Sequence, residues 1–126
     1  MNADETTRLA FLLAKFCSAA ELIGSRGRAR FYGRDPYALP SNTDYDYAVF
    51  TDNKAHFDMF YEVLYELVEQ FGFVALCCTG GITVSNHGVD LIVYPTKKRN
   101  EIHQAWKLME DGLTKEEAWR TVNTNQ

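Results

Sequence analysis

The strongest constraint on the fold is a set of three short apolar runs at residues 73–78, 82–85 and 89–94. The connections between them, residues 79–81 and 86–88, both contain glycine. Turns this short between β-rich runs are typical of hairpins, because glycine reaches the backbone angles that tight turns need. We therefore predict three antiparallel strands that neighbour one another in a β-sheet.

Further strand and helix patterns come before this set of strands. Residues 44–51 have the aromatic and β-branched content of a strand. A short apolar stretch at residues 22–25, broken by Gly24, predicts another strand that leads into a tight turn. Apolar residues at helical spacing predict a helix over residues 57–71, and Gly72 ends it.

Both ends of the chain show helical patterns. Apolar residues between positions 9 and 20 recur at helical spacing behind a polar start that can cap the helix. Near the other end, Asn100 can cap a helix that Gly112 closes. Thr114 and Glu117 form a capping box for a last short helix. The predicted fold class is α/β (α+β), a mixed β-sheet of about five strands with helices packed against it.

One segment, residues 26–43, differs in kind from the rest. Glycine, proline, serine and asparagine are frequent in it, so we expect mostly loop, with at most one short helical turn after Ser25. It also contains four arginines: Arg26, Arg28, Arg30 and Arg34.

Length and composition limit the class of protein. With 126 residues the chain has room for one domain with one core, which we place at residues 1–126. The 46% apolar and 24% charged residues are typical of a folded chain. A formal net charge of -4 argues against non-specific binding of nucleic acid over the whole surface, and it leaves a local basic patch open.

The cysteines and the first residues indicate the compartment. An odd set of three, with Cys77 and Cys78 adjacent and Cys17 far away, argues against a disulfide framework or a tetrahedral zinc site. The acidic start lacks the basic region of a signal peptide, and no apolar run has the length of a membrane span. We expect a reduced cytoplasmic location, that of the host cell if the gene is viral, and no membrane partner.

Three aspartates are the first candidates for chemistry. Asp44 and Asp46 lie two residues apart on a predicted strand, so their carboxylates point the same way and can grip one cation. Hard oxygen ligands favour Mg²⁺ or Mn²⁺. Asp90 lies in an otherwise apolar strand, where an unpaired carboxylate is costly. The alternatives are a solvated edge for the first two aspartates and a turn-capping role for Asp90.

A second candidate is the dipeptide of Gly24 and Ser25, between a strand and the arginine-rich segment. Glycine allows close approach of the backbone, and the serine hydroxyl with nearby amides can cradle phosphate oxygens. Other polar residues are weaker candidates. His87 and the basic run at residues 97–99 are more simply explained as exposed surface.

These elements occur in the order GSRGR (residues 24–28), SNTDYD (residues 41–46) and VDL (residues 89–91). In that order they resemble the polymerase-β-type nucleotidyltransferase superfamily. The resemblance covers about residues 5–95 and implies that these form a catalytic core, followed by C-terminal helices at about residues 99–123. Compared with compact members, the gap before Asp44 is longer, with residues 34–40 looking like an insertion, and we expect no fused substrate-binding domain.

The resemblance implies an activity and a role for each motif. A nucleoside monophosphate would pass from an NTP, with ATP as one such substrate, to a hydroxyl on a protein or RNA acceptor, and pyrophosphate would be released. Gly24 and Ser25 would bind the triphosphate. Asp44 and Asp46 would hold Mg²⁺ (or Mn²⁺), and Asp90 would complete the metal site and help to activate the attacking hydroxyl.

Two arginines of the GSRGR motif are predicted to bind nucleotide. Arg26 and Arg28 can neutralise phosphate charge, because guanidinium groups suit bidentate phosphate contact. The alternative for each is a solvated basic loop.

The sequence is compatible with either a protein or an RNA as the acceptor. Small stand-alone members of the superfamily include enzymes that modify a partner protein and enzymes that modify tRNA. The net charge favours a protein acceptor, the arginine-rich segment favours RNA, and a partner protein is a further source of specificity. The competing hypothesis is a catalytically silent module of the same fold that acts by docking on a partner protein.

Overall fold

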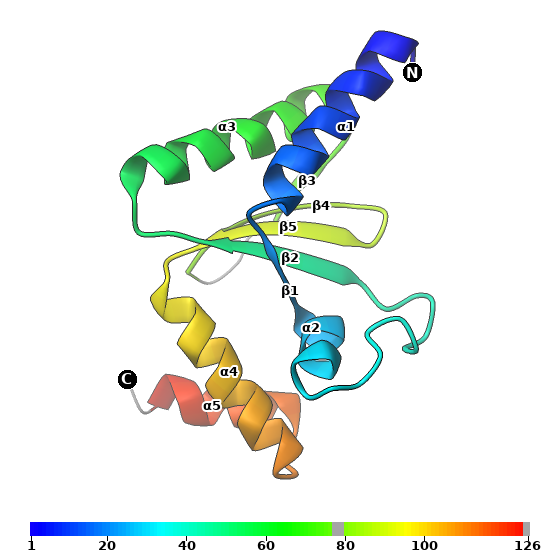
Figure 1. Cartoon of the computed structure of the whole chain (residues 1–126). Coiled ribbons are helices and arrows are strands. Elements are labelled where there is room, and N and C mark those ends of the chain that lie inside the picture. The colour runs from blue at the N-terminus through cyan, green and yellow to red at the C-terminus, as the bar shows by residue number, and fades with distance from the viewer. Residues whose placement is uncertain (77–79, 125–126) are drawn as a thin grey trace.

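A five-stranded mixed sheet has helices on both of its faces in the computed structural model of the protein (Figure 1). The structure describes residues 1–76 and 80–124. In chain order the elements are α1 (Ala3–Cys17), β1 (Glu21–Ile23), α2 (Gly24–Phe31), β2 (Tyr45–Phe50), α3 (Lys54–Phe71), β3 (Val74–Leu76), β4 (Ile82–Asn86), β5 (Val89–Tyr94), α4 (Lys97–Glu110) and α5 (Lys115–Thr124). The predicted mixed fold of helices and about five strands is confirmed. None of the helices in the described ranges combines the length and apolarity needed to cross a membrane.

The strands follow one another in space as β1-β2-β5-β4-β3. β2 and β5 are parallel, and every other neighbouring pair is antiparallel. The predicted antiparallel set of three strands is therefore confirmed as β3, β4 and β5, while Cys77 and Cys78 lie outside the described residues. His87 (φ +49°) and Gly88 (φ +80°) form the two-residue turn between β4 and β5, with the left-handed angles that such hairpins require.

One face of the sheet packs against α1 and α3 (Figure 1). Alternate side chains of the central strands, such as Val49, Leu91 and Val93, point to this face and are buried. Phe16 of α1 meets Phe60 of α3 edge to face, with ring centroids 5.8 Å apart. The apolar cluster on this face is larger than the one on the opposite face, so it provides most of the hydrophobic stabilisation.

The opposite face packs against α4 and has a smaller core. Ala48 and Ile92 from the strands contact Ile102 and Trp106 of α4. α5 packs in turn on α4 through small residues and Val122. Asp46 precedes Ala48 by two residues and Asp90 precedes Ile92 by two, so both aspartates point to this second face.

Two helix boundaries test the predicted caps. The capping box of Thr114 and Glu117 is confirmed, with two reciprocal hydrogen bonds of 3.2 Å. The predicted cap at Asn100 is wrong, because α4 already begins at Lys97 and Asn100 lies inside it. The carboxylate of Asp52, far away in sequence, accepts hydrogen bonds from the amide and the hydroxyl of Thr96, and this contact sets the start of the helix.

α2 is longer than the single turn predicted from sequence, since it extends over eight residues. Its glycines and arginines are weak evidence for a helix in isolation. In the fold, Arg26, Gly27 and Ala29 are buried, and a Cβ on Gly27 would lie 2.3 Å from the carbonyl oxygen of Leu22. Close packing against β1 therefore stabilises a helix that local propensity does not predict.

Candidate metal and phosphate site

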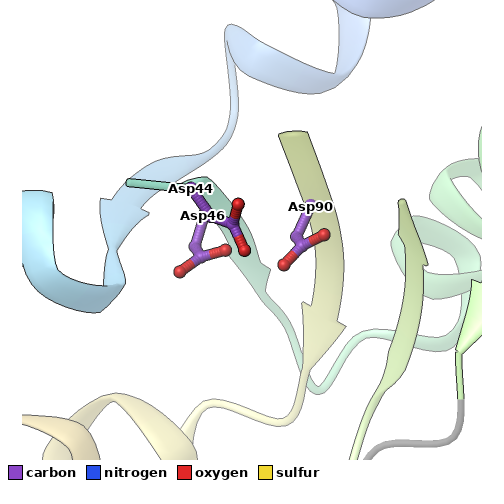
Figure 2. A group of neighbouring side chains, drawn as sticks. All are labelled: Asp44, Asp46 and Asp90. Carbon is purple, nitrogen blue, oxygen red and sulfur yellow. The ribbon is translucent and has the colours of Figure 1, made fainter. Parts of the chain in front are cut away.

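Three aspartates gather at the start of β2 and β5 (Figure 2). The parallel register places Asp46 opposite Asp90, and Asp44 lies just before β2. Each residue offers one carboxylate oxygen, and these atoms all lie within 4.8 Å of one another. The structure thus brings together the three acids that were singled out in the sequence.

The neighbouring turn holds Asp44 in place. The amide of Tyr45 donates a hydrogen bond of 2.8 Å to the carbonyl of Gly88, which ties the start of β2 to the β4–β5 turn. A Cβ on Gly88 would lie 3.6 Å from a carboxylate oxygen of Asp44, so the turn passes close to that side chain. His87 is exposed in the same turn.

Burial and the neighbouring acids disturb the ionisation of Asp46. Burial raises the pKa of Asp46 to about 7, and a hydrogen bond with Asp90 and the charges of Asp90 and Asp44 act in the same direction. The positive charge of Lys115 acts in the opposite direction. A divalent cation would remove this repulsion, so the site has the charge and the oxygen ligands that Mg²⁺ or Mn²⁺ prefers.

Gly24 lies against Asp46 and begins α2. Its φ is +66°, and a Cβ there would lie 2.2 Å from Oδ2 of Asp46, so both backbone angle and space require glycine. No side chain among the described residues caps the first turn of α2. Its first amides and the positive end of the helix dipole are therefore free to bind an anion beside the acids, next to the exposed Ser25.

A cavity of about 540 Å³ extends from this point between the sheet and the helices α4 and α5. Gly24, Ser25, Asp46 and Asp90 are among the residues that line it. A larger groove of about 710 Å³ lies between α1 and α3, and none of the predicted site residues lines it. We therefore take the smaller cavity as the candidate site.

Arg26 has a different role from the one predicted. Its side chain is 1% exposed and donates hydrogen bonds to the carbonyls of Thr43 (2.9 Å), Pro36 (2.8 Å) and Pro40 (3.3 Å). The guanidinium also lies over the ring of Tyr45, 3.9 Å from its centroid. The predicted contact of Arg26 with phosphate is therefore wrong. Arg26 is a positioning residue, because its guanidinium N–H groups hold the loop that leads to Asp44.

Arg28 lines the cavity, but its charge is already paired. It forms an ion pair of 2.6 Å with Glu110, and Arg34 binds the same carboxylate at 2.8 Å. Hydrogen bonds from Arg34 and Arg28 lower the pKa of Glu110 to about 2. The predicted nucleotide contact of Arg28 stays a prediction.

Three further residues of the cavity had no predicted role in the site. Lys115 begins α5, Trp119 lies one turn later, and Thr83 lies on β4. No motif marks them, because they reach the cavity only when α4 folds back across the sheet. The only signal in the sequence is a threonine within an apolar strand.

Comparison of the chain with protein-family models, with curated proteins and with solved structures found no significant match. The resemblance to nucleotidyltransferases therefore stays an expectation from the order of the three sequence elements.

We predict that Arg26→Ala lowers the free energy of unfolding by about 3 kcal/mol, because the buried Arg26 side chain is lost and three backbone carbonyls lose a charged donor. Urea unfolding measures the change. Arg30→Ala is the matched control, since Arg30 lies on the same helix with an exposed side chain, and it should change stability by less than about 0.5 kcal/mol. Equal effects of the two variants would contradict the positioning role.

We predict that Gly24→Ala disrupts binding of Mn²⁺, because its Cβ displaces the carboxylate of Asp46. Gly33→Ala is the matched control: Gly33 also has a positive φ, +76°, but nothing lies within 4 Å of its Cβ. Both variants incur the left-handed backbone cost of about 1–2 kcal/mol. Calorimetric titration with Mn²⁺ should therefore show weaker binding only for Gly24→Ala, and equal affinities would contradict the prediction.

We predict that the metal-free protein becomes less stable as the pH rises from about 4 to about 7. Folding raises the pKa of Asp46 from 3.8 to about 7, so the native state binds the additional proton in this window and loses it above. Asp46→Asn removes the titrating carboxyl group, so the plot of unfolding free energy against pH should be flatter between about pH 4 and 7. Urea unfolding in EDTA across this pH range measures both proteins, and identical slopes would contradict the prediction.

Proposed function

We propose that the protein is a metal-dependent nucleotidyltransferase with a nucleotidyltransferase-like fold, which moves a nucleoside monophosphate from an NTP to a hydroxyl group. The observation that carries this proposal is the meeting of Asp44, Asp46 and Asp90 beside Gly24 and the uncapped start of α2. A metal-binding group and an anion-binding group then lie side by side, and Gly24, Ser25, Asp46 and Asp90 line one cavity. An NTP bound to a divalent cation needs both.

The three carboxylates fit Mg²⁺ or Mn²⁺. All the ligand oxygens come from aspartates. Burial raises the pKa of Asp46, and the nearby charges of Asp90 and Asp44 add to the shift, so a cation beside them would be favourable. When bound, the metal would supply positive charge to the phosphate oxygens. Asp44, Asp46 and Asp90 would hold it.

The triphosphate would lie against the start of α2. The amides of its first turn point out of the helix, and the hydroxyl of Ser25 adds a donor. Lys115 supplies positive charge near Asp46, and Arg28 lines the same cavity. These groups would orient the α-phosphate towards the acceptor.

The reaction is a displacement at phosphorus. The acceptor hydroxyl oxygen forms a bond to the α-phosphorus, and the bond from that phosphorus to the bridging oxygen of the β-phosphate breaks. Pyrophosphate leaves with the electron pair of that bond. The carboxylate of Asp90 accepts the proton of the hydroxyl, since it lies beside Asp46 and lines the cavity.

The acceptor would be a hydroxyl on a protein or an RNA. Within this chain, the loop at residues 32–44 that Arg26 holds is a source of acceptor specificity, and a partner protein is another. Such a loop beside the acids is well placed to contact an acceptor, because binding residues are frequent on loops that a rigid scaffold positions.

We predict that the protein binds an NTP only with Mg²⁺ or Mn²⁺ and transfers label from the α-labelled NTP to an acceptor in lysate. Asp46→Asn combined with Asp90→Asn should lower transfer at least about 100-fold, because both the ligands and the proton acceptor are lost. Asp58→Asn is the control, since Asp58 is exposed on α3 at the other face. A labelled band sensitive to protease or to ribonuclease identifies the acceptor class.

The same experiment separates the enzyme from a catalytically silent docking module. Binding of a partner protein that survives both substitutions, with no NTP bound in the presence of metal, would contradict the proposed function. Calorimetry with each NTP, with and without Mg²⁺, gives that answer independently of the acceptor.

A further inference from the structure

The cavity beyond the aspartates contains a buried hydroxyl group without a partner. Thr83 is 5% exposed, and its Oγ1 makes no hydrogen bond within the described part of the chain. It lines the same cavity as Asp46 and Asp90. A buried unpaired hydroxyl is costly and uncommon, so its presence needs an explanation.

The sheet places this hydroxyl within reach of the site. Thr83 pairs with Ile92 on β5, and Asp90 lies two residues before Ile92 on the same face. Strand geometry then separates the Cα atoms of Thr83 and Asp90 by about 8 Å. One small molecule can therefore contact the acids at one end and Thr83 at the other.

The lining of the cavity suits a flat ring with polar atoms at its edge. Ile92 and Ile102 are apolar, and Trp119 adds an aromatic ring. The ammonium group of Lys98 lies 5.0 Å from the ring centroid of Trp119, and its side chain is only 15% exposed. Apolar walls with a few placed donors and acceptors are typical of sites for small organic ligands, as is a volume of about 540 Å³.

We propose that this cavity holds the nucleobase of the NTP and that the hydroxyl of Thr83 hydrogen-bonds to the polar edge of the base. Thr83 is then a specificity-determining residue, and it acts on the base while Gly24 and the aspartates act on the phosphates. This inference rests on the proposed function, because it takes the triphosphate to lie at the start of α2.

The test compares Thr83→Val with Thr83→Ser by calorimetry. Valine has the same shape and lacks the hydroxyl, whereas serine keeps it. Each protein is titrated with the four NTPs, with inorganic tripolyphosphate and with the four nucleosides, all in Mg²⁺. Because Oγ1 has no protein partner among the described residues, Thr83→Val should fold and melt at or above the temperature of the wild type.

We expect one NTP to bind more tightly than the others and more tightly than tripolyphosphate. Thr83→Val should bind that NTP about tenfold more weakly, with tripolyphosphate unchanged, and Thr83→Ser should restore binding. If Thr83→Val fails to fold, Thr83→Ala takes its place with the same expectation.

Three results would overturn the inference: equal binding of all NTPs and tripolyphosphate by the wild type, unchanged NTP affinity in Thr83→Val, or no binding of any probe. The first two leave the proposed function standing, because the phosphates still bind. Binding of a nucleoside that depends on Thr83, without binding of tripolyphosphate, would support the base site and contradict the proposed function.

Discussion

The parallel pairing of β2 with β5 is the interaction on which the rest of the structure depends. It joins two strands far apart in sequence and extends from Tyr45 and Val89 to Phe50 and Tyr94. Its register sets Asp46 beside Asp90 on one face of the sheet, and sends Val49 and Val93 to the opposite core under α1 and α3. A shift of one residue would turn the acids into the core, so the apolar packing of one face specifies the geometry of the other.

Contacts with the surrounding fold keep the three aspartates close together despite the repulsion between their carboxylates. Burial and a hydrogen bond with Asp90 raise the pKa of Asp46, and Gly24 leaves the space that Asp46 occupies. Arg26 holds Thr43 before Asp44, and the β4–β5 turn holds Tyr45 after it. Closely spaced charges and perturbed pKa values are frequent at functional sites, where the surrounding fold maintains a geometry that the local groups do not favour.

The elements that sequence predicted well have strong local signals. The three antiparallel strands, the helix ended by Gly72 and the capping box at Thr114 are all present, because turn chemistry, spacing and caps act over a few residues. The start of α4 and the length of α2 were missed. The first depends on Asp52, and the second on burial against β1, and neither contact can be read from neighbouring residues.

The amino-acid sequence by itself determined the elements of the sheet, the identity of the three aspartates and the glycine that begins α2, because each depends on residue type and short spacing. Only the tertiary structure decided that Arg26 binds backbone carbonyls, that Lys115 lies near Asp46 and that Thr83 faces the same cavity as the acids. These outcomes depend on where α4 and α5 fold back and on which strand pairs with which. That choice is made by burial of apolar surface over the whole chain, and no short segment records it.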